Sequence, residues 1–476
     1  MKLVLLNHPF RYEMEKLSRE FFPENAIEVT EDVPEENAVI TEIDGEEIIV
    51  RFDGEEKRRD ISGITDKNDL ERIMAQMLYK LLGEKTGIYP EWGILTGIRP
   101  SKVMRSKEIE LGEEKAREYF ENELFVSEKK TKLAKLITDV QQPLINLSDK
   151  NSFSLYISIP FCPTRCSYCS FISHSYESAK KLIPEYVDKL IEEIRHTGEI
   201  VKELSLKLET VYYGGGTPTV LSAPELKRIA VAIEESFDLS GLREYTVEAG
   251  RPDTITPEKL DVLKESNVTR ISINPQTFND EVLKVIGRHH TSEQTEESFL
   301  LARKKGFDNI NMDLIAGLPS DTTESFENTL NRVLSLSPEN VTVHTLAIKR
   351  SSSMGLSLTD IKQAQTAGEM LKIAEGKLRN EYHPYYMYRQ SKSLSNLENV
   401  GWCKQGMEGL YNIYMMEEIH SVFSCGAGAV TKLKEPDGKQ IERIFNFKYP
   451  FEYIKDYGEI LSRKDRIKEF YKSYTY

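Results

Sequence analysis

The 476-residue chain is long enough for two to four domains, and its 29% charged and 39% hydrophobic residues are those of a globular protein, not of a disordered or fibrous one. Lys and Arg total 63 against 77 Asp and Glu, and the net charge of −14 disfavours nucleic acid and anionic membranes as partners. The sequence contains no run of about 18 apolar residues and therefore predicts no membrane span. Its five cysteines are too few for a disulfide scaffold, so we expect a cytoplasmic protein.

The first third of the chain predicts a small N-terminal α/β domain over residues 1–88 and a helical connector over residues 89–150. Strands are expected at residues 2–6, 38–43 and 47–52, and helices at residues 11–22, 69–82, 107–123 and 127–147. A loop rich in Gly and Pro, residues 92–102, precedes the last two helices. None of these segments indicates a chemistry.

Strand-like and helical segments alternate from residue 153 onward, as in a parallel sheet with helical crossovers. The expected strands are residues 153–159, 210–213, 244–248, 268–273, 309–315 and 340–346, and the expected helices are residues 180–203, 224–236, 257–266, 292–305, 323–336 and 358–381. Six such units predict an α/β fold with an open, partial (β/α)6 barrel over residues 151–385, whose chemistry lies at the carboxyl ends of the strands. Residues 386–476, with a Gly-rich segment at 425–430, predict a small α+β domain.

The strongest chemical signal is a C-x3-C-x2-C cluster, Cys162, Cys166 and Cys169, directly after the first strand of this region. Three thiols within eight residues of one loop can face a single soft metal centre. The alternative is a structural zinc ion, which needs four ligands; His174 would then be the fourth ligand beside the three cysteines. Three cysteines instead suit a 4Fe–4S cluster with one iron left open for a substrate. We therefore expect these cysteines to bind the cluster and to be essential for catalysis.

Glycines and polar residues recur where the later strands end. Gly214, Gly215 and Gly216 follow the second strand and allow a ligand to approach the backbone closely, although the segment lacks the lysine of a phosphate loop and the spacing of a dinucleotide fingerprint. Four polar side chains follow at later strand ends and, around one barrel mouth, suit ribose hydroxyls, a carboxylate and a substrate: Glu248, Gln276, Arg288 and Asp313. The neighbouring His289 and His290, on a charged connection, are expected to be a solvated pair.

The cysteine loop resembles that of the radical S-adenosylmethionine (SAM) superfamily, whose hallmark is this spacing after the first barrel strand. The resemblance implies that the open iron binds the amino and carboxyl groups of SAM. Electron transfer from the cluster then cleaves SAM to methionine and a 5′-deoxyadenosyl radical. The resemblance also implies that Tyr168 lies near the adenine and that the Gly-rich segment binds the SAM amino group.

Residues 150–350 narrow the resemblance to the oxygen-independent coproporphyrinogen III dehydrogenase (HemN-like) family. The segments that carry it are LYISIPFCPTRCSYCSF, YYGGGTPT, TVEAG, RISINPQTF, GRHH and NMDLIAGLP. The whole chain is most similar to the HemZ-type subgroup, through WGILTGIRP and EGLYNIYMMEEIHSVFSCGAGAVTK. The resemblance implies two SAM molecules and these SAM-site residues: Tyr156, Tyr168, Gly215, Gly216, Thr217, Glu248, Gln276, Arg288, Asp313, Ala347 and Val430.

The implied reaction is the oxidative decarboxylation of coproporphyrinogen III. Loss of a β-hydrogen, carbon dioxide and one electron turns a propionate into a vinyl group, and two such steps give protoporphyrinogen IX. The implied partners are the porphyrinogen and a one-electron donor of the flavodoxin or ferredoxin type. The substrate's four carboxylates require cations, and the candidates near the motifs are Arg165, Arg251, Lys349, Arg350, Arg389 and Lys432.

Three departures from the characterised dehydrogenases leave the substrate open. Phe171 stands where they have a further cysteine, EAGRPD replaces an EVDP-like string, and the N-terminal domain is unlike theirs. One alternative is a haem chaperone that keeps the cluster and the SAM fold, with His420 or Cys403 as haem ligand, although YNIYMMEEIHS lacks the His-Asn and Tyr-Trp string of that branch. The other is an enzyme that opens or methylates haem anaerobically. Both alternatives predict oxidised haem as the ligand, whereas the dehydrogenase requires the reduced porphyrinogen.

Overall fold

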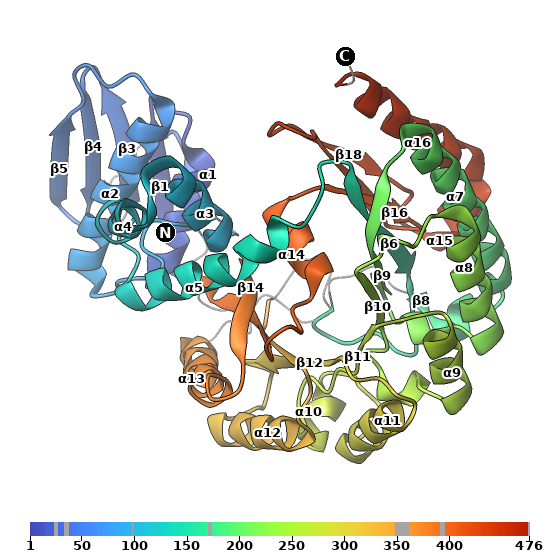
Figure 1. The fold of residues 1–476 in the computed structure, drawn as a ribbon. Helices are drawn as coiled ribbons and strands as arrows, with labels where there is room; N and C mark the ends of the chain where they lie inside the picture. The colour runs from blue at the N-terminus through green and yellow to red at the C-terminus, as the bar shows by residue number, and fades with distance from the viewer. Residues whose placement is uncertain are drawn as a thin grey trace. The chain divides into compact units, whose positions relative to one another are not determined.

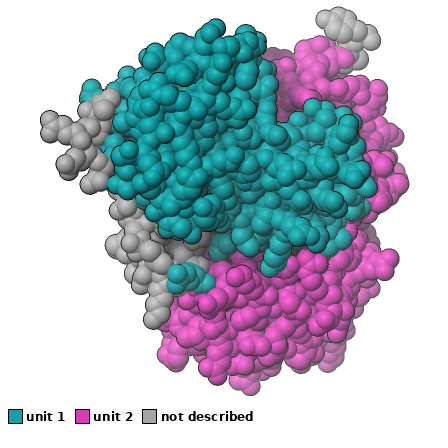
Figure 2. All heavy atoms as spheres, turned by 90° about the vertical axis from the view of Figure 1, so that its left-hand side faces the viewer, with its two compact units in different colours: residues 1–139, 356–365, 387–398 teal, residues 140–355, 366–386, 399–476 magenta. Residues whose placement is uncertain are grey.

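The computed structural model describes residues 1–22, 27–32, 38–97, 99–169, 174–347, 361–390 and 396–474. The chain forms two compact units, coloured separately in Figure 2: residues 1–139, 356–365 and 387–398, and residues 140–355, 366–386 and 399–476. These boundaries differ from the four predicted segments, because the last segment, residues 386–476, is divided between the two units. No helix in the described ranges has the length and apolarity that crossing a membrane requires.

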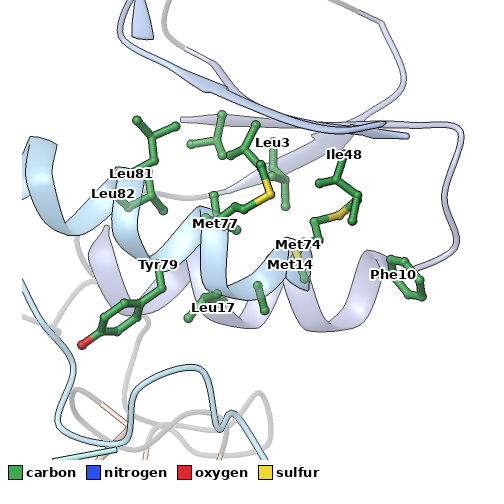
Figure 3. Close-up of a cluster of buried hydrophobic side chains, with 14 of the residues drawn as sticks. Leu3, Phe10, Met14, Leu17, Ile48, Met74, Met77, Tyr79, Leu81 and Leu82 are labelled. Carbon is green, nitrogen blue, oxygen red and sulfur yellow. The ribbon is translucent and has the colours of Figure 1, made fainter. Parts of the chain in front are cut away.

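The first unit is built on a five-stranded sheet in the order β2-β1-β3-β4-β5. Its elements are β1 (Lys2–Leu6), α1 (Arg11–Phe21), β2 (Glu28–Thr30), β3 (Ala38–Asp44), β4 (Glu47–Phe52), β5 (Glu55–Asp60) and α2 (Lys67–Thr86). In Figure 3 the side chains of Leu3 and Ile48 from the sheet meet Met14, Met74 and Met77 from the two helices. The apolar spacing that predicted these helices therefore reflects this core. Strand β5 was not predicted, because its sequence EEKRRD has no apolar alternation and it lies at an exposed sheet edge.

The predicted connector consists of more and shorter helices than expected. These are α3 (Pro100–Leu111), α4 (Glu113–Glu118), a π-helical turn (Tyr119–Glu123) and α5 (Glu128–Ile145). The single helix expected over residues 107–123 is broken at Gly112, whose φ of 85° does not continue a helix. Trp92 and Lys130 both bond the buried carboxylate of Glu398, so the segment at 387–398 is tied into the first unit.

The second unit contains an open, curved sheet, and the predicted partial (β/α)6 barrel is confirmed. Its central strands are parallel and follow chain order: β6 (Ser152–Ile159), β9 (Lys207–Gly215), β10 (Glu244–Glu248), β11 (Arg270–Ser272), β12 (Ile310–Ala316) and β13 (Asn340–Thr345). The connecting helices are α7 (Ile183–Leu204), α8 (Ala223–Ser236), α9 (Pro257–Glu265), α10 (Asp280–Val285), α11 (Ser292–Lys304), α12 (Thr323–Leu336) and α13 (Ile361–Leu378). Figure 1 shows α7, α8, α9, α11 and α12 along the outer face of the sheet.

The strands alternate between apolar side chains packed under these helices and polar side chains on the inner, concave face. The polar side chains bond one another from strand to strand. Thr210 Oγ1 donates to Ser154 Oγ at 2.7 Å, and Thr342 Oγ1 donates to Asn311 Oδ1 at 3.0 Å. A closed barrel of this kind is filled by branched apolar residues, so a polar interior, called the lumen below, suits a ligand rather than a packed core.

The C-terminal strands extend this sheet at both edges instead of forming a sheet of their own. The elements are β14 (His383–Arg389), β15 (Glu398–Cys403), α14 (Leu410–Glu417), β16 (Ser421–Cys425), β17 (Val430–Lys434), β18 (Ile441–Phe445), α15 (Pro450–Lys455) and α16 (Tyr457–Lys472). Strand β15 pairs antiparallel with β13, and β16 pairs parallel with β6. The sheet order in the described chain is therefore β14-β15-β13-β12-β11-β10-β9-β6-β16-β17-β18.

Candidate functional site

The three cysteines of the C-x3-C-x2-C motif lie on the loop that follows β6. Cys162 ends the short strand β7 (Phe161–Cys162), Cys166 is buried, Cys162 and Cys169 are half-buried, and none forms a disulfide. Thr217 Oγ1 donates to Cys162 Sγ at 3.5 Å, and Arg251 Nη1 lies 3.9 Å from Cys166 Sγ. Donors beside sulfur stabilise the thiolate form and tune a cluster that thiolates hold. The donor set therefore fits an iron–sulfur cluster.

The described residues do not gather these cysteines around a single small ion. Sets of at least three His, Cys, Asp or Glu ligand atoms within 4.8 Å of one another occur at His383, Cys403 and Glu408 and at Glu108, Glu113 and Asp139, and neither set includes His174 or the cysteine loop. Tetrahedral zinc with bonds of about 2.3 Å brings its sulfur ligands to about 3.8 Å from one another. At least one pair of the three sulfurs is therefore more than 4.8 Å apart, which is wider than a zinc site allows. Residues 170–173, including Phe171, lie outside the described ranges.

The cysteine loop is anchored to the segment that follows α10. Ser167 N donates to Ile286 O at 3.0 Å, and Thr164 Oγ1 donates to Gly287 O at 3.0 Å. Arg251 holds the same loop, because its Nη2 donates to Thr164 Oγ1 at 3.1 Å. These bonds position the cysteines from two sides of the barrel mouth.

The glycines at the end of β9 allow two backbones to touch. Gly216 N donates to Ile159 O at 2.8 Å, and Thr217 N donates to Phe161 O at 2.7 Å, which joins β9 to the strand that leads into the cysteine loop. A Cβ at Gly216 would lie 2.5 Å from Phe161 O, so no other residue fits there without moving the backbone. Gly215 has a φ of 103°, a conformation that favours glycine.

Three stacked tyrosines line the lumen above Glu248. The ring centroids of Tyr156 and Tyr212 are 6.1 Å apart, and those of Tyr212 and Tyr411 are 4.3 Å apart, with interplanar angles of 14° and 22°. Tyr212 Oη donates to Glu248 Oε1 at 2.6 Å. Desolvation raises the pKa of Glu248 to about 7, although this hydrogen bond opposes the shift. Glu248 is therefore a carboxyl group that changes charge near neutral pH.

The pKa of Asp313, in β12, is shifted in the opposite direction. Its Oδ1 accepts from Asn311 Nδ2 at 2.8 Å, and its Oδ2 lies 3.6 Å from His344 Nε2. Burial alone would raise the pKa of Asp313, but its hydrogen bonds and the His344 and Arg270 charges lower it below the usual value. The lumen thus holds one carboxylate that stays charged and one that titrates.

Gln276 and Arg288 belong to the loops above β11 and α10. Gln276 has a φ of 65°, and its N donates to Asp313 O at 2.9 Å. Arg288 is buried, lies beside Tyr168, and donates from Nη1 to Asn274 O at 2.7 Å. Both residues therefore lie at the barrel mouth next to predicted site residues.

The prediction of a solvated histidine pair is right for His289 and wrong for His290. His289 is exposed, whereas His290 is buried. Burial, followed by the charges of Arg288 and Arg251, lowers the pKa of His290 to about 3. One of the two adjacent imidazoles on this connection is therefore buried and the other is exposed. The charged residues around them do not predict this difference.

The two remaining predicted SAM-site residues lie at opposite edges of the parallel sheet. Ala347 follows β13 at its carboxyl end. Val430 begins β17, after the Gly-rich turn. That turn lies at the carboxyl end of β6, where Ser158 Oγ donates to Ala427 O at 2.8 Å and Ala427 N donates to Tyr186 Oη at 2.9 Å.

Residues that sequence analysis missed complete the lumen: Arg270, Tyr212, Tyr411 and His344. Arg270 is fully buried at the start of β11, and its charge acts on both Glu248 and Asp313. Strand alternation would have placed Arg270, Tyr212 and His344 on the inner face. Nothing in the sequence predicts Tyr411 there, because its position depends on where α14 docks.

Most of the described arginines and lysines that were candidates for binding the porphyrin carboxylates instead contact other residues of the protein. Arg389 forms a buried ion pair with Glu20 at 3.0 Å within the first unit, and Lys432 lies 3.5 Å from Glu418. Arg251 holds the cysteine loop, as described above, and Arg165 is exposed on that loop. Lys349 and Arg350 lie outside the described ranges.

Comparison with known proteins identifies the family. The model of the radical SAM superfamily matches residues 156–333. The oxygen-independent coproporphyrinogen-III oxidase-like protein HemZ of Bacillus subtilis (strain 168) is 39% identical over 418 residues, which cover 85% of this chain and 83% of that protein. The heme chaperone HemW of the same organism is 36% identical over 282 residues, 58% of this chain and 70% of that protein.

A solved structure shares the fold. The coproporphyrinogen III oxidase HemN from Escherichia coli, a radical SAM enzyme, superposes with a TM-score of 0.50 and 23% identity over 68% of this chain and 72% of that chain. The chain thus belongs to the radical SAM superfamily and, within it, to the haem-related family that includes HemZ, the oxygen-independent coproporphyrinogen III oxidase-like protein.

Proposed function

We propose that this protein is a radical SAM oxidoreductase that decarboxylates two propionates of coproporphyrinogen III to vinyl groups, giving protoporphyrinogen IX. The observation that carries the proposal is one juxtaposition: three cysteines that form no disulfide and a polar lumen with Glu248 and Asp313 meet at the carboxyl edge of one open sheet. The 39% identity to HemZ over 85% of the chain supports the same conclusion. A reducing cytoplasm suits cysteines that form no disulfide.

Membership of the superfamily implies a 4Fe–4S cluster and SAM. When bound, they supply a one-electron cleavage of SAM whose radical product removes a hydrogen atom from the substrate. We propose that Cys162, Cys166 and Cys169 hold the cluster and that a flavodoxin- or ferredoxin-type protein reduces it. Each propionate loses one hydrogen atom, one carbon dioxide and one electron, so an electron acceptor is also required.

The chain's own residues position the reactants. We propose that the Glu248 carboxylate accepts hydrogen bonds from ribose hydroxyls, with Tyr212 Oη fixing its orientation at 2.6 Å. Gln276, Arg288 and Asp313 would complete the SAM site, together with Tyr156, Tyr168, Gly215, Gly216, Thr217 and Ala347, and Val430 would contact a second SAM molecule. Positioning of this kind, with exclusion of water, is the protein's contribution to the rate.

The test is an anaerobic assay of the reconstituted protein with SAM, a reductant and coproporphyrinogen III. The proposal predicts one carbon dioxide for each vinyl group formed, that is, two for each protoporphyrinogen IX, and no product without SAM. SAM cleavage without decarboxylation would reject this substrate while leaving the radical SAM assignment intact.

A haem chaperone is the second candidate, because HemW relatives match more than half of this chain. The structure disfavours the two haem ligands suggested by the sequence. His420 is buried, with Nε2 2.8 Å from Ser154 Oγ and Nδ1 3.0 Å from Ser148 Oγ, so both ring nitrogens have partners. Cys403 is fully buried beside His383. Haem titration with a Soret shift that His420→Ala abolishes would favour the chaperone.

A further inference from the structure

A second set of metal-ligating side chains lies at the other edge of the sheet from the cysteine loop. His383 begins β14, Cys403 ends β15, and Glu408 follows on the connection to α14. Cys403 pairs with Asn340 at the amino end of β13, whereas the cysteine loop follows the carboxyl end of β6. The radical SAM site therefore does not use these three side chains.

The three ligand atoms have the spacing of a single coordination sphere. His383 Nε2 is 3.4 Å from Cys403 Sγ and 2.9 Å from Glu408 Oε1, and all three atoms lie within 4.8 Å of one another. A tetrahedral zinc ion with bonds of about 2.0 Å to nitrogen and oxygen and about 2.3 Å to sulfur separates its ligand atoms by about 3.3–3.6 Å. The two distances from His383 Nε2 differ from these by at most a few tenths of an ångström, and the separation of Cys403 Sγ from the Glu408 carboxylate is at most 4.8 Å. Rotations of the side chains bring the three atoms to the geometry of zinc.

The surroundings hold this arrangement in place. Lys404 N donates to Glu339 O at 2.9 Å and Leu410 N donates to Glu244 Oε2 at 2.6 Å, so the connection that carries Glu408 is fixed at both ends. Within it, Gly406 N donates to Glu408 Oε1 at 3.2 Å. The Cys403 side chain is fully buried, whereas the His383 and Glu408 side chains are 27% and 11% exposed. An ion therefore has access from the His383 side, and a water molecule can occupy the fourth position.

We propose that His383, Cys403 and Glu408 bind a zinc ion. A thiolate, an imidazole and a carboxylate form a ligand set for a borderline-soft divalent metal, and zinc takes this set without redox chemistry. When zinc binds, the Cys403 thiol releases its proton to solvent and the thiolate takes the metal, with no change of oxidation state. The ion joins β14, β15 and the connection to α14, the helix that carries Tyr411 into the lumen. The site does not depend on the proposed decarboxylation.

The test measures metal in the full-length protein after anaerobic reconstitution of the cluster and gel filtration. We expect about one zinc per chain beside the cluster iron, and a zinc K-edge spectrum with one sulfur at about 2.3 Å and lighter ligands at about 2.0 Å. His383→Gln and Glu408→Gln should each lower zinc retention at least tenfold without changing the iron content. Cys403→Ser should remove the sulfur scatterer.

His196→Gln is the matched control, because His196 Nε2 lies 3.2 Å from Asp465 in a histidine–carboxylate pair without a thiol. It should retain all of the zinc. The proposal is overturned if zinc is absent, if the spectrum requires three sulfurs and so places zinc in the cysteine loop, or if His383→Gln retains zinc like the unchanged protein. Because His383 is partly exposed, its replacement keeps the test valid even where Cys403→Ser fails to fold.

Discussion

The two lumen carboxyls show how neighbours decide the chemistry of a residue. Glu248 has a pKa raised to about 7 by desolvation, whereas the hydrogen bonds of Asp313 and the charges of His344 and Arg270 lower its pKa. Groups with pKa values pushed apart in one site can play different roles. Around neutral pH, Asp313 stays ionised while Glu248 gains or loses its charge.

The raised pKa of Glu248 predicts a pH dependence of SAM binding. As the pH falls from 8 to 6, Glu248 binds a proton and its acceptor strength is lost, so the Kd for SAM should rise about tenfold. Glu248→Gln should bind SAM about tenfold more weakly at pH 8 and lose most of the pH dependence. Equilibrium dialysis of the reconstituted protein with SAM measures both. Asp313→Asn, the control, should weaken binding and keep a pH dependence that moves to lower pH, because the Asp313 charge contributes to the raised pKa of Glu248. An unchanged pH profile in Glu248→Gln would contradict the assignment.

Sequence patterns predicted the positions of Glu248 and Asp313 but not the directions of their pKa shifts. Glu248 and Asp313 were predicted because polar side chains at the ends of parallel strands meet at one edge. Their pKa directions depend on Tyr212, Arg270 and His344, which contact them from other strands. The burial of His290 likewise depends on how the loop after α10 folds back, which a local charge pattern does not reveal.

Gly216 predicts a steric test of the same site. In Gly216→Ala the new Cβ would meet the Phe161 carbonyl oxygen at 2.5 Å, so the strand that leads into the cysteine loop must shift. We expect loss of most of the iron bound after reconstitution. In the control, Gly376→Ala in α13, the new Cβ meets no atom within 4 Å apart from its chain neighbours and the backbone of its own helix, and stability should rise by about 0.5–1 kcal/mol. Full cluster loading in Gly216→Ala would contradict the close approach.

At the scale of elements, the C-terminal strand β16 and helix α16 support the strand that precedes the cysteine loop. β16 pairs with β6 along its length, and Lys464 of α16 is fully buried against Glu193 of α7, with its Nζ 3.1 Å from the carboxylate. Glu193 also accepts from Gly426 N at 2.7 Å, in the Gly-rich turn. The pair thus links two helices to this turn.

Removing the cation of this pair should destabilise the second unit strongly. Lys464→Met keeps the volume but leaves the Glu193 carboxylate buried without its only ion-pair partner among the described residues, at a cost of about 3–5 kcal/mol. Lys468→Met, one turn later, removes a surface pair with Glu203 at 2.7 Å and should cost less than about 1 kcal/mol. Denaturation midpoints in urea compare the two. Equal shifts would show that Lys464 is no more important than a surface lysine.

The repeating elements were predictable, and the long-range pairings were not. The six parallel strands and their helices follow from local alternation and amphipathic spacing. Lys464 and Lys468 look alike in the sequence, because both lie in a charged amphipathic helix and only tertiary packing distinguishes them. The sheet neighbours β15 and β16 are separated in sequence from β13 and β6, so no local pattern pairs them.

At the scale of the whole molecule, only one of the two units has features that indicate a reaction. The second unit has a cysteine loop, a polar lumen and a family match, and all three indicate radical SAM chemistry. The first unit has a well-packed core around Leu3, Met14 and Met74 and no motif that indicates a reaction. Composition predicted a multi-domain protein but not the return of residues 387–398 to the first unit.

The most direct test of the radical SAM assignment is the formation of 5′-deoxyadenosine by the reconstituted, reduced protein supplied with SAM. The account predicts about four irons per chain and SAM cleavage that Cys166→Ala abolishes, while the control Cys425→Ala, which removes a buried thiol outside the loop, retains the iron and the cleavage. Unchanged formation of 5′-deoxyadenosine by Cys166→Ala would contradict the account.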